Sequence, residues 1–184
     1  MRIVAGTHRG RRLVAPRGRV TRPTADKVRE AIFDLVGPPE GAALDLFAGS
    51  GALGLEALSR GAPTATLVDR SPRATATIRA NVLALGLEGR ARIVAADWRR
   101  ALAAERAGGH VYGLVMLDPP YRLLPRIAEV LGPALFPLLA PGATVVIEHA
   151  GTDEPPLVAE LPTVARVDRV YGGTGVSVIR VGPA

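Results

Sequence analysis

Residues 45–54 read DLFAGSGALG and decide the fold class, because a short apolar segment runs into a glycine-rich loop ahead of a helical pattern. Gly49, Gly51 and Gly54 have the spacing G-x-G-x-x-G, which is typical of loops that bind dinucleotides between a strand and a helix. Asp69 follows at roughly 20 residues, the distance of a ribose-binding acid. The glycines indicate a ligand that approaches the backbone closely, and they leave its identity open.

Asp45 helps to choose between ligands for this loop. A carboxylate at the end of the first strand would lie beside the loop and repel a pyrophosphate, with an energy on the order of several kcal/mol in a partly buried site. It would instead attract a cation, such as the ammonium and sulfonium groups of S-adenosylmethionine. The alternative is that Asp45 is a polar capping group that faces water.

Short apolar segments alternate with helical patterns along the chain, as repeated β-α units require. We expect strands at 42–47, 65–69, 91–96, 113–118, 143–149, 164–171 and 175–181, and helices at 21–37, 52–60, 72–85, 98–106 and 122–139. Thr24 can cap the first of these helices, and Ser71 and Pro72 can begin the third. Residues 2–6 and 11–16 flank a turn-like segment and predict an N-terminal hairpin.

This order predicts an α/β fold with a doubly wound, mostly parallel seven-stranded sheet whose edge is an antiparallel hairpin. Residues 1–38 are expected to form a small basic extension of a hairpin and a helix, and residues 39–184 the main domain. Ligands of such sheets bind at the carboxyl ends of the strands, near the switch in strand order. Since each motif follows a strand, we expect the motifs to lie along one rim of the sheet.

Two further acidic residues follow strands. Asp69 could accept hydrogen bonds from ribose hydroxyls, while its neighbour Arg70 could equally indicate a 2′-phosphate. Asp97 could accept a hydrogen bond from an adenine amino group, with Trp98 packed on the ring. The alternative for this second pair is an N-cap aspartate beside a core tryptophan.

The segment LDPPY, residues 117–121, predicts the chemistry. Pro119 and Pro120 remove two backbone donors and stiffen the turn, which holds the carbonyls in place as acceptors. Asp118 adds a side-chain acceptor, and Tyr121 adds an aromatic face. These groups form a cradle for a planar amino group on a ring, which suits methyl transfer to an exocyclic amine by positioning and removal of water. A structural Asp-Pro-Pro turn would explain the prolines but not their place at this rim.

The excess positive charge lies in the N-terminal segment. Residues 1–30 hold nine of the 23 basic side chains and two of the 17 acidic ones, while the whole chain has a formal net charge of +6. This clustering favours a nucleic acid partner over a solvated arm of an arginine-rich protein. We expect the extension to face RNA, through Arg9, Arg11, Arg12, Arg22, Lys27 and Arg29. For Arg29 a surface ion pair is the alternative, and for Arg22 contacts at the start of the helix.

Composition excludes several other kinds of site. Cysteine is absent, which rules out disulfides, thiolate zinc sites and a cysteine nucleophile. His8, His110 and His149 have no ligand partner at a useful spacing, so we expect no metal. No apolar run approaches about 18 residues, and the basic N-terminus lacks the apolar core of a signal peptide. We therefore expect a cytoplasmic protein without a membrane span, and a monomer.

The motifs also carry a family resemblance. Residues 45–62 (DLFAGSGALGLEALSRGA) and 118–121 (DPPY) resemble motifs I and IV of S-adenosylmethionine-dependent amino-methyltransferases that act on exocyclic nitrogens. Residues 2–36 are similar to the start of the RsmD-type family, bacterial methyltransferases for guanine N2 of 16S ribosomal RNA. The most specific part is Thr21–Thr24, and residues 169–180 (RVYGGTGVSVIR) resemble the ending of that family. The resemblance covers almost the whole chain.

The resemblance implies a Rossmann-like methyltransferase with a small N-terminal extension. Its cofactor would be S-adenosyl-L-methionine, its product S-adenosyl-L-homocysteine, and its substrate a flipped guanine of 16S ribosomal RNA, either naked or in an assembling small subunit. The cofactor-binding residues would be Asp45, Phe47, Ala48, Gly49, Ser50, Gly51, Asp69, Arg70, Asp97 and Trp98. Asp118, Pro119, Pro120 and Tyr121 would hold the guanine. Asp69 departs from the pattern, in which glutamate is frequent, but it should still reach a diol.

Other functions share parts of this pattern. A DNA or protein-amide amino-methyltransferase could use the same DPPY cradle. An NAD-dependent oxidoreductase suits the full G-x-G-x-x-G, although no His or Lys lies near the rim of the fourth strand to act as a proton donor. A non-enzymatic RNA-binding module would explain the basic segment but not DPPY.

Overall fold

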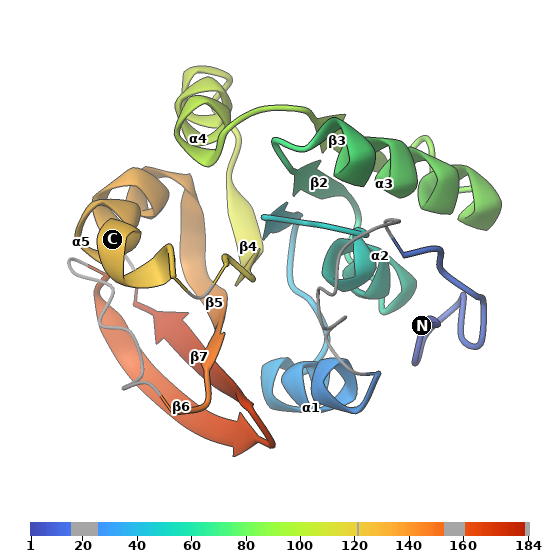
Figure 1. Cartoon of the computed structure of the whole chain (residues 1–184). Coiled ribbons are helices and arrows are strands. Elements are labelled where there is room, and N and C mark those ends of the chain that lie inside the picture. Colours follow the sequence, from blue (N-terminus) through green and yellow to red (C-terminus); the bar gives the residue numbers. More distant parts are fainter. Residues whose placement is uncertain (16–25, 121, 153–160, 183–184) are drawn as a thin grey trace.

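The centre of the protein is one sheet, seen in a computed structural model that describes residues 1–15, 26–120, 122–152 and 161–182. Within these ranges seven strands have the order β3-β2-β1-β4-β5-β7-β6 (Figure 1). They are β1 (Ala43–Leu46), β2 (Ala65–Val68), β3 (Ala91–Val94), β4 (Tyr112–Leu117), β5 (Leu139–Ala150), β6 (Thr163–Tyr171) and β7 (Thr174–Val181). β1 to β5 run parallel, β7 is antiparallel to β5, and β6 is antiparallel to β7. The predicted fold class is confirmed.

Helices cover both faces of this sheet (Figure 1). They are α1 (Asp26–Val36), α2 (Ala52–Ser59), α3 (Pro72–Leu85), α4 (Trp98–Ala107), α5 (Leu124–Leu135) and the short 3₁₀ helix η1 (Phe136–Leu138). One apolar core lies under α1, α2 and α3, and a second lies under α4 and α5. Because side chains alternate along a strand, Ala43 faces the first core while Leu44 and Leu46 face the second. No helix in the described ranges is long and apolar enough to cross a membrane.

Most elements occur where the sequence predicts them, and the differences have local causes. Ser71 caps α3, its hydroxyl oxygen accepting the Ala74 N–H at 3.4 Å. The helix expected over 122–139 ends at Leu135 and continues as η1, in which Pro137 has no N–H to extend an α-helical ladder. The expected cap Thr24 lies outside the described residues.

The N-terminal residues 1–15 pack on the sheet domain instead of standing apart from it. Within the described part of the predicted hairpin, a single antiparallel bridge joins Arg2 and Arg12. Ile3 and Leu13 are buried in the same core as α1 and α2. A Cβ at Gly6 (φ 80°) would stand 1.9 Å from the Ser59 carbonyl oxygen, so only glycine permits this approach to the end of α2. The division at residue 38 stays a prediction, and the segments on either side of it share one core.

The strand register aligns the carboxyl ends of the central strands. Leu46 of β1 pairs with Val68 of β2 and with Leu117 of β4, and Leu117 pairs with Ile147 of β5. The order of strands changes direction between β1 and β4, because the chain adds β2 and β3 on one side of β1 and β4 on the other. The residues that follow these ends therefore meet at the switch point, where ligands bind in doubly wound sheets.

Candidate active site

The glycine loop leaves β1 at this rim and enters α2. Phe47 has a φ of 71°, the only positive φ of a non-glycine residue among those described. The Ala48 N–H donates to the Val68 carbonyl oxygen at 2.9 Å, which ties the loop to β2. Gly51, with a φ of 80°, is the N-cap of α2. Phe47, Gly49 and Ser50 are half-buried, so part of the loop is open to solvent.

Asp69 holds this loop from the neighbouring strand. Its Oδ2 accepts the Gly49 N–H at 2.9 Å, and its Oδ1 accepts the Ser71 N–H at 2.8 Å. The carboxylate thus joins the loop to the start of α3. Each carboxylate oxygen can accept a second hydrogen bond, so Asp69 keeps acceptor capacity for a diol. Arg70 is exposed next to it.

Asp45 lies behind the loop rather than in it. Its side chain is 1% exposed, and its Oδ2 accepts the Gly54 N–H at 2.8 Å. Burial raises the pKa of Asp45 to about 7; the Gly54 hydrogen bond opposes this, and the charges of Asp118 and Asp69 add to it. Of the alternative, a capping group that faces water, the capping part is confirmed, because Asp45 accepts an N–H in the first turn of α2, but the exposure to water is wrong, because the carboxyl is buried. Its effect on a ligand would be electrostatic and would act through the loop.

Gly54 allows Asp45 to pack against α2. A Cβ at Gly54 would stand 3.1 Å from the Asp45 Cβ, 3.2 Å from its Oδ2 and 3.0 Å from the Leu67 Cδ2. The third glycine of the G-x-G-x-x-G pattern is therefore a buried site of close packing between helix and strand.

Asp97 and Trp98 take the structural roles given above as the alternative. The Asp97 side chain caps α4 by accepting the Arg99 N–H at 3.0 Å. Trp98 is 5% exposed and belongs to the core under α4 and α5. Asp97 itself is half-buried, so an adenine contact stays a prediction for this residue.

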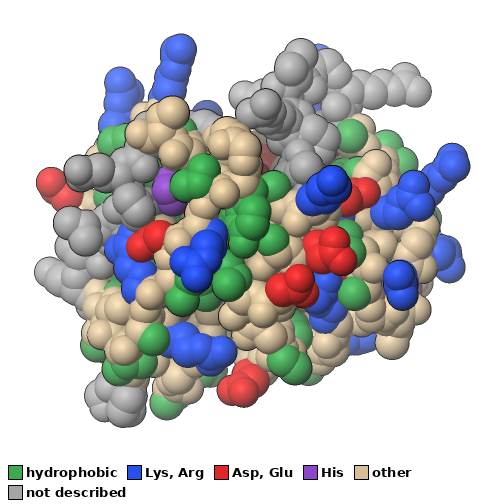
Figure 2. Space-filling view, turned by 90° about the horizontal axis from the view of Figure 1, so that it is seen from below, with side chains coloured by type: hydrophobic (Ala, Val, Ile, Leu, Met, Phe, Trp, Pro, Cys, Tyr) green, Lys and Arg blue, Asp and Glu red, His purple; other side chains and the backbone are tan. Residues whose placement is uncertain are grey.

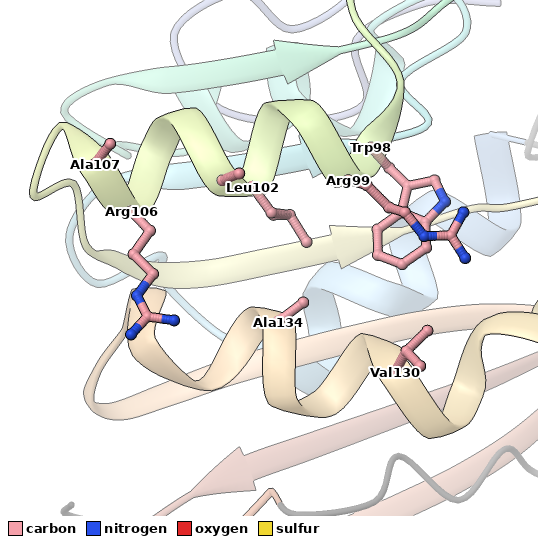
Figure 3. A pocket seen from close by; sticks show the side chains of 8 residues that line it. Trp98, Arg99, Leu102, Arg106, Ala107, Val130 and Ala134 are labelled. Carbon is pink, nitrogen blue, oxygen red and sulfur yellow. The ribbon is translucent and has the colours of Figure 1, made fainter.

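The surface of the protein has a groove at helices α4 and α5 (Figure 3). It has a volume of about 640 Å³ and lies between α4 and α5, with the Arg99 guanidinium 4.6 Å from the centre of a Trp98 ring at one end and Arg106 at the other. Leu102, Val130 and Ala134 contribute to its apolar lining. Its lining residues come from the two helices and not from the glycine loop.

The DPPY segment follows β4 at the same rim as the glycine loop. Asp118 is half-buried, Pro119 is buried and Pro120 is exposed. The Pro120 carbonyl oxygen accepts the Leu123 N–H at 2.7 Å, so one of the carbonyls expected to face a substrate already closes a turn. Tyr121 lies outside the described residues. Among the described residues of the predicted cradle, Asp118 lies close enough to Asp45 for its charge to act on it.

The residues predicted to contact RNA do not share one environment. Arg9, Arg11, Arg12 and Lys27 are exposed, and the Arg11 guanidinium also donates to the Ala84 carbonyl oxygen at 2.6 Å. Arg22 lies outside the described residues. The face of the molecule shown in Figure 2 carries basic and acidic side chains intermixed, and it presents no separate basic patch in its coloured part.

The prediction that Arg29 contacts RNA is wrong, because its side chain is fully buried. Its guanidinium pairs with Glu56 at 3.3 Å and with Asp26 at 2.9 Å, and it donates to the Arg2 carbonyl oxygen. The Glu56 carboxylate also accepts the N–H groups of residues 4 and 5, at 2.8 and 2.9 Å. A guanidinium enclosed in this way cannot reach a phosphate, and it is not the surface ion pair considered above either. It joins the N-terminal segment to α1 and α2.

A second polar cluster lies at the opposite, amino end of the sheet, and no sequence motif predicts it. Arg92 and the Tyr112 hydroxyl both bond the Glu105 carboxylate, the latter at 2.5 Å, and the hydroxyl also contacts Thr66 at 3.1 Å. Burial alone would raise the pKa of Glu105, but the bonds from Arg92 and Tyr112 lower it on balance. For Tyr112, burial and the Glu105 bond raise the pKa to about 12.

Metal-ligating side chains do not gather anywhere in the part of the chain that the structure describes. His149 is buried in β5, with its Nε2 3.4 Å from the Ser177 Oγ. Ser177 donates to Asp168 at 2.6 Å, and Arg166 pairs with the same carboxylate. This chain of hydrogen bonds accounts for His149 as a packed, bonded residue of the β5-β7-β6 edge.

Known proteins share both the sequence and the fold described above. The family model described as Conserved hypothetical protein 95 matches residues 1–180. The Bacillus subtilis (strain 168) protein YlbH is 40% identical over 191 residues, covering 98% of each chain. Ribosomal RNA small subunit methyltransferase D of Escherichia coli (strain K12) is 41% identical over 124 residues, which cover 66% of this chain and 61% of that protein.

Solved structures extend the comparison to the fold. The Escherichia coli protein yhhF matches with a TM-score of 0.83 at 33% identity, covering 100% of this chain and 99% of that one. An RNA methyltransferase from Salinibacter ruber, in complex with S-adenosyl-L-homocysteine, matches with a TM-score of 0.66 at 22% identity, covering 87% and 94%, and so shares the fold. The matched residues 1–180 include the N-terminal segment, the glycine loop and DPPY. The chain belongs to the family described as Conserved hypothetical protein 95, the RsmD-type family.

Proposed function

We propose that this protein transfers a methyl group from S-adenosyl-L-methionine to the exocyclic N2 of a guanine in small-subunit (16S) ribosomal RNA. The S–CH3 bond breaks as the N–CH3 bond forms, and the products are S-adenosyl-L-homocysteine and one proton released from the amine. One observation carries the proposal: Asp45 and Asp69 bond the backbone of the glycine loop and of the start of α2, and Asp118 follows the aligned end of β4 at the same rim. Burial raises the pKa of Asp45, and the charges of Asp118 and Asp69 add to this. A negative site of this kind suits a cationic ligand and disfavours a pyrophosphate. The relative named Ribosomal RNA small subunit methyltransferase D supports ribosomal RNA as the substrate.

The residues present fit the proposed cofactor. Its methionine part would lie along the backbone of Gly49–Gly51, which the Asp69 carboxylate holds in place through the Gly49 N–H. Asp69 would use its remaining acceptor capacity for the ribose hydroxyls. Asp45 would stabilise a nearby positive charge through the loop. When bound, S-adenosylmethionine supplies an electrophilic methyl group on a sulfonium centre.

Asp118 and the prolines would orient the guanine. The amine lone pair of guanine is delocalised into the ring, and a carboxylate that accepts an N–H of this amine makes the lone pair more available. Pro119 is buried, which holds Asp118 in place beside it. In this arrangement catalysis comes from positioning and from exclusion of water, and no side chain forms a covalent bond to the substrate. Tyr121 would stack on the base.

Access to the amino group requires that the guanine leaves its stack, which costs on the order of a few kcal/mol when the base is paired. Phosphate contacts from the exposed Arg9, Arg11 and Arg12 would help to offset this cost. Because the basic segment has no interleaved aromatic residues, recognition by RNA shape and phosphates fits it better than stacking on single strands.

Calorimetry and nucleoside analysis test the proposal. The protein should bind S-adenosylhomocysteine and not NAD, and it should produce N2-methylguanosine in small-subunit ribosomal RNA, measured by mass spectrometry of the digested RNA. Naked RNA and assembling subunits are offered as separate substrates. Binding of NAD alone would reject the cofactor, and a methyl group on DNA or on a protein amide would reject the substrate.

The Asp118→Ala variant is the matched control. It should bind S-adenosylhomocysteine nearly as well as the unmodified protein, because we assign Asp118 to the guanine and not to the cofactor, and it should not methylate RNA. Full methylation by this variant would show that the DPPY segment is not the cradle. RNA binding without methylation by the unmodified protein would instead indicate a binding module.

A further inference from the structure

Asn81 is the only side-chain amide in the sequence, and it is 1% exposed on α3. Its Oδ1 accepts the Val14 N–H at 2.8 Å, and its Nδ2 donates to the carbonyl oxygens of Val14 at 3.0 Å and of Ser50 at 2.9 Å. The two carbonyl partners require the nitrogen of the amide, and the N–H partner requires the oxygen, so all three bonds agree on one orientation. One side chain therefore links the N-terminal segment to the glycine loop.

The glycine loop is held from two sides through its backbone. Asp69 accepts the Gly49 N–H at 2.9 Å, and Asn81 donates to the carbonyl of the next residue, Ser50. The Ser50 hydroxyl also lies 3.8 Å from the Met1 Sδ, a second contact with the N-terminal segment. A displacement of that segment would thus act directly on the loop that we assign to the cofactor.

The N-terminal segment, residues 1–15, also carries exposed positive charge. Arg9 and Arg12 are exposed on it, and Arg11 reaches the Ala84 carbonyl oxygen of α3. Positions 81 and 84 lie three residues apart on the helix and share a face. The segment is therefore laid along one stripe of α3, with the Asn81 contact at the glycine-loop end of that stripe.

We propose that Asn81 is a positioning residue that couples RNA binding to cofactor binding. It keeps residues 1–15 and the glycine loop in one arrangement, so that RNA bound to these residues raises the affinity of the loop for the cofactor. By the same factor, the bound cofactor raises the affinity of the protein for RNA. This inference rests on the proposed function. Through this coupling the protein would bind RNA and cofactor together more readily than either of them alone.

The structure offers two matched controls. Ser59 anchors the same segment without touching the loop, because its Oγ donates to the Ala5 carbonyl oxygen at 2.6 Å and accepts the His8 N–H at 2.9 Å. Thr75 is 2% exposed on α3, and its hydroxyl bonds only the Pro72 carbonyl oxygen of its own helix among the contacts described. Ser59→Ala therefore loosens the segment, and Thr75→Val disturbs the helix, with the link intact in both.

The experiment measures the affinity of the full chain for S-adenosylhomocysteine by calorimetry, with and without a small-subunit ribosomal RNA transcript. In the unmodified protein the transcript should tighten binding about 5-fold or more, within the usual range of coupling between sites. In Asn81→Ala, and in Asn81→Asp, which keeps the size but loses the two donors, this ratio should fall to about 1. Ser59→Ala and Thr75→Val should keep the ratio of the unmodified protein.

Several results would overturn the inference. These are a ratio of about 1 in the unmodified protein, an unchanged ratio in the Asn81 variants, or an equal loss in Ser59→Ala. Absence of any binding of S-adenosylhomocysteine to the unmodified protein would instead reject the proposed function.

Hydrogen exchange of the unmodified protein tests the coupling even if the variants do not fold. S-Adenosylhomocysteine alone should slow exchange in peptides from residues 1–15, and the RNA transcript alone should slow exchange in peptides from residues 45–54. Protection confined to the site of each ligand would also reject the inference.

Discussion

The two ends of the parallel sheet hold buried carboxyl groups in opposite electrostatic surroundings. At the carboxyl end, Asp45 is buried near two other acids, and its pKa is raised to about 7. At the amino end, the Glu105 side chain is also buried, but the bonds from Arg92 and Tyr112 lower its pKa on balance. Glu105 has its cation within the protein, whereas the Asp45 carboxyl accepts a hydrogen bond from the backbone N–H of Gly54.

This difference separates a structural group from a group poised for a ligand. A charge that is paired within the fold contributes to stability and has little to offer a ligand. A buried carboxyl without a cation costs stability, and a cationic ligand nearby would recover part of that cost. The carboxyl end is therefore where we place the chemistry, although both ends hold perturbed acids.

The largest effect is expected from Asp118→Ala, at the carboxyl end. Methylation in single-turnover assays should fall about 100-fold or more, the size of effect seen when one preorganised polar contact to the reacting group is lost. Affinity for S-adenosylhomocysteine should change less than about 2-fold, because the variant leaves the glycine loop in place. Parallel losses in rate and in cofactor affinity would place Asp118 in the cofactor site instead.

Glu105→Gln tests the amino end. It should lower the free energy of unfolding by about 2 kcal/mol in urea titrations, because it leaves Arg92 without its charge partner; Arg92 is partly exposed, which moderates the loss. Since the folded pKa of Glu105 is lowered, the stability that it contributes is present above the unfolded pKa and is lost as pH falls through the folded value. Affinity for S-adenosylhomocysteine should stay unchanged, and a loss there would remove the contrast between the two ends.

Asp45→Asn should have effects opposite to those of Glu105→Gln: it should weaken cofactor binding and raise stability at neutral pH. The amide can still accept the Gly54 N–H, so the variant removes the charge and keeps the contact. Affinity for S-adenosylhomocysteine should fall about 10-fold, or about 1.4 kcal/mol. Because the pKa rises from 3.8 to about 7 on folding, the carboxylate costs stability increasingly as pH rises between these values, and that cost is largest above pH 7.

The melting temperature tests whether the charged carboxylate of Asp45 destabilises the folded protein. Asp45→Asn should melt higher than the unmodified protein at pH 8, with a smaller difference at pH 5. An equal difference at both values would show that the charge of Asp45 is not the cause.

The smallest effect is expected from Gly54→Ala, which crowds Asp45 without changing any charge. The added Cβ would press on the Asp45 side chain and on the Leu67 Cδ2, so stability should fall by about 1 kcal/mol despite the better helix propensity of alanine. Gly89→Ala is the control, because a Cβ there meets nothing within 4 Å. Urea titrations of both should show a loss at position 54 alone.

Local patterns were enough to predict much of the fold and the position of the site. Ser71 and Pro72 predict the start of α3, and the apolar strands with their helical spacers predict the parallel sheet, since both depend on neighbours in the sequence. The aligned strand ends then bring Asp69 and Asp118 to one rim, as expected from topology.

Contacts between distant segments were not predictable in this way. From the sequence, Arg29 is one of several basic residues in a segment predicted to face RNA. Only the packing shows that it is enclosed with Glu56, 27 residues further along the chain. Asn81 has no motif around it, and its partners lie 31 and 67 residues away. The cluster of Glu105, Arg92 and Tyr112 is likewise scattered in the sequence.

The sequence by itself determined the order of elements, the glycine loop and the acids that follow the strands, because periodicity, caps and turns depend on residues a few positions apart. The tertiary structure decided which charges are paired and which are not. Burial and the approach of distant side chains set the protonation of a carboxyl group, and neither can be read from a local pattern. For this reason Asp45, which the sequence marks as an acid at a strand end, and Glu105, which no sequence motif marks, have opposite electrostatic surroundings in the fold.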